Sequence, residues 1–377
     1  MKRQLQKASI LFALLASVGC ASDPRDVASD DTSIQGSTST LYSRKEIVTS
    51  GLVPVSELAA KVGQDVPLAD AAASQNYEAL ARLAASGQHE NLVLGVYGMQ
   101  AVSGDVLGTA AERAKQAGIS GKPIQRGRYA VVSDPNGREL RLNADSGSEF
   151  IQDLNRFHAS DGVARVASDA QFAGWARRYL AGSLSPEAGK LPLYLYKVRH
   201  YRNGEAAEAQ SGASVSTYQV AVAFSTTIDD LPVIGAGGKV AVHFDPAGKP
   251  IGHEANLRAA VRLLSLVKGS ELIAPEKAQG VLEKQLSERG VDLKQYRLSR
   301  AEFGYACLGR DSQQNVLAPH YGYVWEPIEQ QGLKKLVELV PAFSSPEALA
   351  LLDRDGAIEQ KRKLSRKAAA SAETKRE

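Results

Sequence analysis

The amino-acid sequence predicts an α+β fold in which helices pack on antiparallel sheets. Its 377 residues are 44% hydrophobic and 23% charged, an ordinary globular composition with enough apolar material for a core. Strand-like segments flank strong turn sequences at 134–137 (DPNG) and 245–248 (DPAG), and each arrangement indicates a β-hairpin. Apolar residues recur at helical spacing in 166–180 and 276–289, which predicts two amphipathic helices.

The chain begins with a leader that ends near Cys20. Lys2, Arg3 and Lys7 precede an uncharged, largely apolar run at 8–18, and small residues follow it. This order is typical of a secretory signal and is too short to span a bilayer. With a cysteine at its end, the leader resembles a bacterial lipoprotein signal. The resemblance implies a signal peptide at 1–19, cleavage before Cys20, and attachment of acyl chains such as palmitate to that cysteine.

The residues after Cys20 suggest where the lipid anchor holds the protein. In lipoproteins, an aspartate directly after the cysteine favours the inner membrane, whereas Ala21 and Ser22 stand here. By resemblance, we expect the protein in the cell envelope, on the outer membrane and facing the periplasm or the surface. Residues 20–45 form the lipidated cysteine and a flexible tether, since 21–40 are rich in Ser, Thr and Asp.

The charge and cysteine counts exclude several classes of protein. Removing the three leader cations from 45 Lys and Arg leaves 42, which equals the 42 Asp and Glu, so no general nucleic-acid binder is expected. Two cysteines exclude a disulfide-rich scaffold. With Cys20 lipidated, Cys307 has no partner within the chain, and a buried structural thiol is the expected role.

The first region of the body, 46–160, is expected to be mixed α and β. Helices are predicted at 55–62, 68–85 and 109–117, and a strand at 91–97. The hairpin around 134–137 joins strands at 128–133 and 139–142.

Two helix-and-sheet units are expected after it, at 161–262 and 263–345. In the first, a helix at 166–180 with Ser168 as N-cap precedes strands at 193–202, 215–226, 239–244 and from 250. In the second, a helix at 276–289 follows Pro275, and strands follow at 296–308, 320–325 and 333–341. Residues 346–377 start as a helix and end as a frayed basic tail.

Part of the chain resembles a known kind of module. The segment 220–251 (VAVAFSTTIDDLPVIGAGGKVAVHFDPAGKPI) is similar to the PepSY and thermolysin-propeptide pattern, in which a strand ends at a glycine turn before a hairpin. The sequences at 273–278 (IAPEKA), 303–305 (FGY) and 317–321 (LAPHY) resemble the same pattern in the second unit. The resemblance covers about 165–330, under half of the chain, and its motifs contain no invariant catalytic residue.

The resemblance implies a binding role rather than catalysis. PepSY-like modules usually bind or restrain another protein, often a peptidase, and this chain ends too soon after the second unit to contain a thermolysin-like domain. We therefore expect a lipid-anchored envelope protein that binds a peptidase or an envelope regulator, with no cofactor and no metal. Exposed sheet edges are the expected binding mode, since an edge accepts a partner strand.

Motifs for metal and phosphate binding fail at defined positions. His253 and Glu254 begin like a zinc-protease helix, but Leu257 stands where the second histidine is required. The glycines at 235–238 lack the spacing of a phosphate-binding loop, and a tight turn is expected there instead. The histidines show no metal-ligand spacing, and His243 is expected to be at the surface or half-buried. Asp229 and Asp230, which are neighbours in the sequence before a turn, are expected to face solvent.

Two alternatives to a binding module remain open. A hydrolase could assemble its site from distant segments, and His200, His243, Glu254 and Cys307 are its first candidates. These groups would then converge in one pocket. The other alternative is a structural envelope component whose basic tail contacts anionic lipid or polymer. Most of the aromatic residues at alternating strand positions are expected in the sheet core or in cross-strand pairs, with a partner-binding face as the alternative; these residues are Tyr194, Tyr196, Tyr201, Tyr321, Tyr323 and Trp325.

Overall fold

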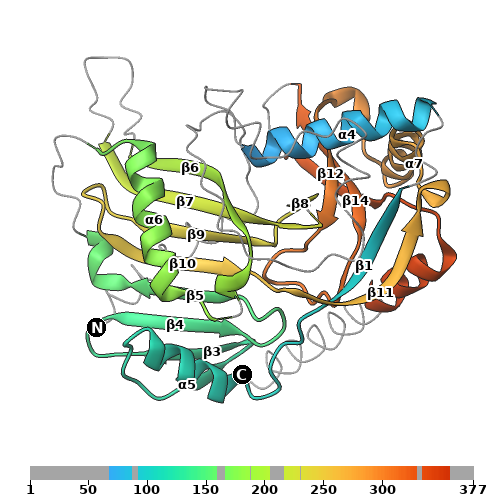
Figure 1. Cartoon of the computed structure of the whole chain (residues 1–377). Helices are drawn as coiled ribbons and strands as arrows, with labels where there is room; N and C mark the ends of the chain where they lie inside the picture. Colours follow the sequence, from blue (N-terminus) through green and yellow to red (C-terminus); the bar gives the residue numbers. More distant parts are fainter. Residues whose placement is uncertain are drawn as a thin grey trace, which may run out of the picture.

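The computed structural model describes the body of the chain, at 68–86, 92–158, 166–186, 188–203, 216–229, 231–328 and 333–356. The leader, Cys20, the tether, the helix predicted at 55–62 and the tail from 357 lie outside these residues. Helices and largely antiparallel sheets make up the described part, which confirms the α+β fold class (Figure 1). No helix in this part of the chain combines the length and the apolar character that crossing a membrane requires.

The elements fall into two sheets with helices on them. The helices are α4 (Leu68–Ser86), α5 (Val106–Gln116), α6 (Asp169–Ser183) and α7 (Pro275–Glu288), with further helical residues at 346–356. The strands are β1 (Val93–Met99), β2 (Ile124–Arg126), β3 (Tyr129–Ser133), β4 (Arg138–Asn143), β5 (Glu149–Asp153), β6 (Leu193–Asn203), β7 (Ser216–Ile228), β8 (Leu231–Ile234), β9 (Lys239–Phe244), β10 (Pro250–Asn256), β11 (Ala260–Lys268), β12 (Tyr296–Ala306), β13 (Val316–Leu317), β14 (Pro319–Pro327) and β15 (Leu336–Pro341). Among the described residues, the larger sheet runs β15-β14-β12-β8-β7-β9-β10-β5-β4-β3-β2 with β6 added on β7, and the smaller runs β11-β1-β13.

In the structure, the first unit is larger than the range 161–262 expected for it. It comprises α5, α6 and the strands from β2 to β10 without β8. Helix α6 lies across β6, β7, β9 and β10 (Figure 1), and a core that includes Phe172, Val222 and Val242 joins the helix to these strands. The predicted N-cap is confirmed, because Ser168 and Gln171 form a capping box at the start of α6. Helix α5 packs on β3 and β4 through a separate small core around Leu140.

A buried ion network attaches α5 and α6 to the same face of the sheet. Arg113 of α5 donates to both carboxylate oxygens of Glu149 on β5, at 2.6 and 2.7 Å. His253 of β10 lies 3.0 Å from the same carboxylate through Nε2, and its Nδ1 lies 3.2 Å from the hydroxyl of Tyr179 on α6. Burial alone would raise the pKa of Glu149, but the hydrogen bonds from His253 and Arg113 outweigh it and hold the pKa at about 2.

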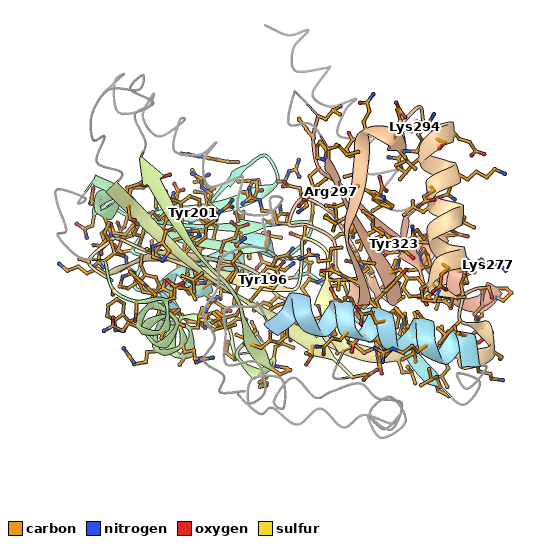
Figure 2. The ribbon with its side chains drawn as sticks, turned by 90° about the horizontal axis from the view of Figure 1, so that it is seen from above. Tyr196, Tyr201, Lys277, Lys294, Arg297 and Tyr323 are labelled. Atoms are coloured by element: carbon orange, nitrogen blue, oxygen red, sulfur yellow. The ribbon has the colours of Figure 1, made fainter. Side chains whose placement is uncertain are left out.

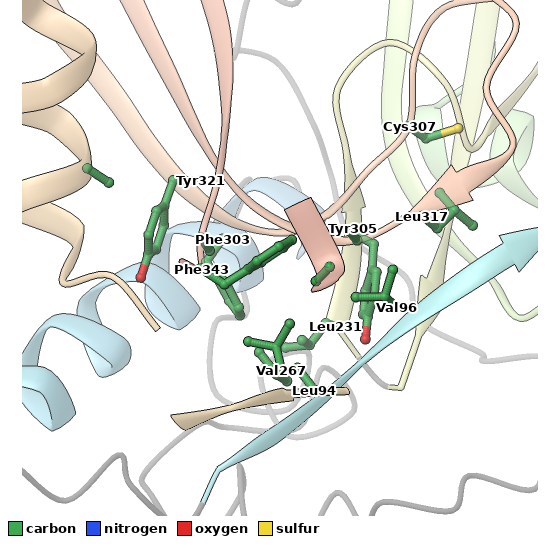
Figure 3. Packing of buried hydrophobic residues seen from close by; sticks show 14 of the residues in the cluster. Leu94, Val96, Leu231, Val267, Phe303, Tyr305, Cys307, Leu317, Tyr321 and Phe343 are labelled. Carbon is green, nitrogen blue, oxygen red and sulfur yellow. The ribbon is translucent and has the colours of Figure 1, made fainter. Parts of the chain in front are cut away.

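The second unit comprises α4, α7, the helical residues 346–356, β1, β8 and the strands from β11 to β15. Its core includes Val96, Leu231, Phe303, Tyr321 and Phe343, which come from distant parts of the chain and lie together in Figure 3. The ribbons of β1 and β11 run side by side (Figure 1), and they pair from Val93↔Lys268 to Met99↔Ala260. The chain therefore closes this core by bringing its first described strand onto a strand that follows it by more than a hundred residues.

This arrangement divides the region expected at 46–160. Its helix α4 and strand β1 belong to the core of the second unit, whereas α5 and β2 to β5 extend the sheet of the first. The boundary expected between 262 and 263 falls inside β11 (Ala260–Lys268). Helical and strand spacing reveal each element but not its partner, because partners are chosen by packing over long sequence distances.

Strand β8 joins the two units. It pairs antiparallel with the end of β7, through Thr227↔Pro232, and parallel with β12, through Tyr305↔Val233. The glycine turn then carries the chain from β8 to β9 in the first unit. Gly235 has a φ of 90°, and a Cβ on Gly237 would lie 2.1 Å from the carbonyl oxygen of Leu308, so both positions require glycine.

A candidate binding site between the two units

A cavity of about 470 Å³ lies at the junction of the two units. Its lining comes from β6, β7, β9 and β10 of the first unit and from β8, β12 and β15 of the second, with Ala73 of α4 added. This volume is in the range of roughly 300–1,000 Å³ that is typical of ligand sites. The cavity is therefore the candidate functional site.

The cavity occupies the sheet face opposite α6. On β7, Val222 and Phe224 point into the α6 core, while Ala221 and Ala223 line the cavity. The same alternation on β9 places Ala241 in the cavity lining. Three alanines therefore form the floor of the cavity. Because their side chains are small, they leave the space above this sheet face unfilled.

A β-bulge in β6 brings additional side chains to this face. The pairing with β7 shifts between Leu195 and Lys197, so Tyr196 is the extra residue. Before the bulge, Leu195 points into the α6 core, and after it Val198 does so. Two consecutive residues, Tyr196 and Lys197, consequently both line the cavity.

Two of the basic side chains that line the cavity make cation–π contacts with tyrosine rings. The Lys239 ammonium lies 4.7 Å from the ring centroid of Tyr196, and its Nζ also donates to the carbonyl oxygen of Gly235. The Arg199 guanidinium lies 5.5 Å from the ring centroid of Tyr201. Such cation–π contacts fix the direction of a long basic side chain. In Figure 2, Tyr196 lies between the two halves of the molecule and Tyr201 lies in the first unit.

Each carboxylate of the lining has an arginine partner. Glu254 accepts from Arg310 at 2.9 Å, and Glu302 lies 2.8 Å from Nε of Arg300. Burial raises the pKa of the Glu254 carboxyl, and Arg310 opposes that rise. The second oxygen of Glu254, Oε2, is buried and has no hydrogen-bond partner among the described residues.

The opposite wall of the cavity is apolar. It is built from Pro232, Val233 and Ile234 of β8 together with Val337 and Leu339 of β15. Val337 remains 48% exposed, and Leu308 at the same site is 40% exposed. The site therefore combines basic and aromatic side chains, which come from both units, with an apolar wall from β8 and β15.

Cys307 is a buried thiol at the edge of this cavity. It is 3% exposed, lies just after β12, and belongs to the border of the second core (Figure 3). Burial raises its pKa to about 11, so the thiol is protonated at neutral pH and is a poor nucleophile. The expected burial of this thiol is confirmed.

The four residues proposed for a hydrolase do not all meet. Glu254 and Cys307 both line the cavity. His200 lies on the opposite sheet face, where its Nε2 is 2.7 Å from Asp169 of α6. His243 shares the cavity face but is not part of the lining, and it contacts Gln219 at 2.7 Å.

Two expectations about exposure were wrong. His243 is only 1% exposed rather than at the surface, and burial, with His253 nearby, lowers its pKa to about 4. Asp229 is half-buried, and its Oδ2 accepts from the hydroxyls of Tyr97 at 2.6 Å and Tyr305 at 3.0 Å, whereas Asp230 lies outside the described residues. This contact fastens β1 to β12 at the end of β7.

The predicted lipid site cannot be compared with the structure, because Cys20 lies outside the described residues. Within the described residues, no group of three or more His, Cys, Asp or Glu side chains is arranged to hold a metal ion. The basic cavity residues were missed at the sequence level. Lys197, Arg199 and Tyr201 alternate along one strand, and this spacing indicated that their side chains share one face of the sheet. The β-bulge at Tyr196 that turns these side chains toward the cavity has no sequence signature.

Comparisons with known proteins provide no functional assignment. No protein-family model and no curated protein matches the chain. Among solved structures, an uncharacterized protein from Eubacterium rectale is similar at a TM-score of 0.40 and 8% identity, covering 67% of this chain and 85% of that one. This likeness is too weak to support an argument about function.

Proposed function

We propose that the protein is a lipid-anchored protein of the bacterial cell envelope that binds another protein and performs no catalysis. The cavity at the junction of the two units is the proposed binding site. The observation that supports this most is its lining: cations, tyrosines and apolar groups surround a floor of alanines, and the cysteine of the lining has a thiol whose pKa is raised by burial. The resemblance of 165–330 to PepSY-like modules points to the same kind of role.

Catalysis is the weaker proposal because of what lines the site. The described lining contains no histidine, serine or threonine, and its cysteine is a protonated thiol. Nucleophilic catalysis needs a nucleophile within hydrogen-bond reach of a base. Glu254 and Glu302 are the carboxylates of the lining that could act as a base, but each is held in an ion pair, with Arg310 and Arg300 respectively.

Two strands beside the cavity offer a way to hold a partner chain. In the described part of the protein, β6 pairs with β7 alone and β15 pairs with β14 alone. Both strands also contribute side chains to the cavity. A partner strand added to either edge would have its alternate side chains next to the cavity, as in strand-addition complexes.

The lipid anchor is a separate part of the proposal with its own test. Cys20→Ser removes the acceptor sulfur, so the variant should leave the membrane fraction and lose incorporation of labelled palmitate. Several acyl chains are needed for firm anchoring, which makes loss of binding the expected result. A variant that stays in the membrane fraction would refute anchoring through Cys20.

The binding role is tested by cross-linking in the native envelope, purification of the anchored protein, and mass spectrometry. One partner should be recovered in near-stoichiometric amount with the wild type. Ala223→Trp, which fills the floor of the cavity, should lose that partner. Lys277→Gln is the matched control, since this exposed lysine on α7 lies far from Tyr196 (Figure 2). Recovery of nothing above background, or of the same partner with Ala223→Trp, would count against the proposal.

A further inference from the structure

We propose that the cavity binds an acidic, extended peptide segment of the partner protein. This inference rests on the proposed function and specifies the chemistry of the bound segment. In it, the cations of the lining pair with carboxylates of the peptide, the β8 and β15 wall contacts its apolar side chains, and a peptide N–H reaches Glu254.

The charge of the lining is the first argument. The described lining residues carry two carboxylates, Glu254 and Glu302, against five cations, namely Lys197, Arg199, Lys239, Arg300 and Lys335. Two of these cations have printed ion pairs, Arg300 with Glu302 at 2.8 Å and Lys335 with Glu326 at 3.3 Å, and the lining keeps a positive excess with both pairs counted. The chain without its leader is close to neutral, with 42 residues of each sign. The positive charge is therefore concentrated at this site, and a concave site of one sign attracts ligands of the other sign.

The arrangement of the cations favours carboxylates over a single compact anion. Lys197 and Arg199 follow one another along β6, whereas Arg300 and Lys335 belong to the second unit. Charges spread over both walls suit a ligand whose negative groups are also spread along its length. Contact of the Arg199 guanidinium with the Tyr201 ring, at 5.5 Å from the ring centroid, fixes the direction of this cation at the cavity.

Glu254 supplies the second argument. Its Oε2 is a buried acceptor without a hydrogen-bond partner among the described residues, and the residue lines the cavity. A buried acceptor without a donor is costly, so a ligand that brings a donor gains affinity at this point. A peptide offers N–H donors along its backbone while its side chains present carboxylates to the cations.

The apolar wall decides between a peptide and an acidic saccharide. Val337 and Leu308 expose 48% and 40% of their surface at the site, and Val233 and Ile234 continue the same wall. Aliphatic side chains of a peptide would bury this wall, whereas the hydroxyls of a saccharide would be desolvated against it. Among the described strands, β6 and β15 each pair on one side alone, which also suits the addition of an extended backbone.

The test measures binding of fluorescein-labelled probes to the purified mature chain by fluorescence anisotropy. The probes are a short peptide of alternating Glu and Val and a matched peptide of alternating Lys and Val, both with blocked ends. The Glu/Val peptide should bind at least about tenfold more tightly than the Lys/Val peptide. Its affinity should fall at high salt, because charge pairing contributes to it.

Variants then locate the binding. The triple variant Lys197→Gln, Arg199→Gln, Lys239→Gln should lose at least about tenfold in affinity for the Glu/Val peptide, and Lys277→Gln should not. If the triple variant does not fold, the single variant Lys335→Gln, at a lining residue just before β15, replaces it in the test. Lys335→Gln should also lower the affinity for the Glu/Val peptide. Circular dichroism reports the folding of each variant.

Four results would overturn the inference. The first is equal affinity for both peptides, and the second is unchanged affinity in the folded triple variant or in Lys335→Gln. The third is competition by trigalacturonate as strong as that of unlabelled Glu/Val peptide, which would assign the site to acidic saccharides. If neither peptide binds while cross-linking still recovers a partner lost in Ala223→Trp, the inference fails and the proposed function stands.

Discussion

Replacing Glu149 by glutamine should destabilise the first unit strongly and in a pH-dependent way. In the folded protein, Glu149 accepts both hydrogen bonds from Arg113 and contacts His253, and its pKa falls from 4.5 to about 2. Each pKa unit corresponds to about 1.4 kcal/mol, so the charged form contributes about 3 kcal/mol. Glu149→Gln also leaves the buried Arg113 without its counter-ion, and breaking a buried pair costs about 3–5 kcal/mol.

The pH dependence has a defined sign. Because the folded-state pKa is depressed, the contribution of Glu149 is complete above the unfolded value of 4.5 and is lost as the pH falls toward 2. The two figures describe the same buried pair and are not added, so the wild type should exceed Glu149→Gln in free energy of unfolding by about 3–5 kcal/mol near neutral pH. The difference should shrink steadily below pH 4.5.

Urea denaturation followed by circular dichroism, at a series of pH values, measures both effects. Glu112→Gln is the matched control, because it is the same substitution at an exposed glutamate that directly precedes Arg113 on α5 and does not belong to the buried network. It should change stability by less than about 0.5 kcal/mol. A difference between wild type and Glu149→Gln that stays constant from neutral to acidic pH would refute the reasoning, because it would show that ionisation of Glu149 is not its source.

Three further predictions concern packing and the thiol. Phe172→Ala removes a fully buried ring from the α6 core and should lower the free energy of unfolding by about 3–5 kcal/mol in urea titrations; a loss below about 1 kcal/mol would contradict that packing. The Cys307 thiol, whose pKa is about 11, should react far more slowly with Ellman's reagent in the native protein than in urea, and equal rates would contradict its burial. Gly237→Ala should destabilise the protein, because the new Cβ would lie 2.1 Å from the Leu308 carbonyl oxygen. Gly280→Ala on α7, where no atom would contact the new Cβ, should instead stabilise the protein by up to about 1 kcal/mol. Thermal unfolding measures the direction of both changes, and a Gly237→Ala variant as stable as the wild type would contradict the close contact.

The local parts of the fold were predictable from the sequence. The hairpin at 134–137 forms because Asp134 Oδ1 accepts from the backbone N–H groups of Asn136 and Arg138, and Gly137 adopts a φ of 76°. Ser168 caps α6 as its position suggests, and Pro275 begins α7. In each case the deciding contacts lie within a few residues of sequence.

The non-local parts were not predictable in the same way. Strand β1 pairs with β11, and β8 runs parallel to β12, although nothing in either short segment specifies its partner. His243 illustrates a signal that was present but missed. The β9 sequence (KVAVHF) is almost continuously apolar, as expected when both faces of a strand are covered, so a histidine within it is buried on either face.

The cavity depends on both units, which gives ligand binding a structural consequence. Its floor of alanines and the Lys197 side belong to the first unit, whereas the Val337 wall and Arg300 belong to the second. A ligand that contacts both walls binds only when the two units are folded and joined through β8. By mass action, such a ligand stabilises the joined state over any state in which one unit has opened. Binding at this site would therefore also fix the relative position of the β6 and β15 edges, the two edges beside the cavity at which we propose that a partner strand can add.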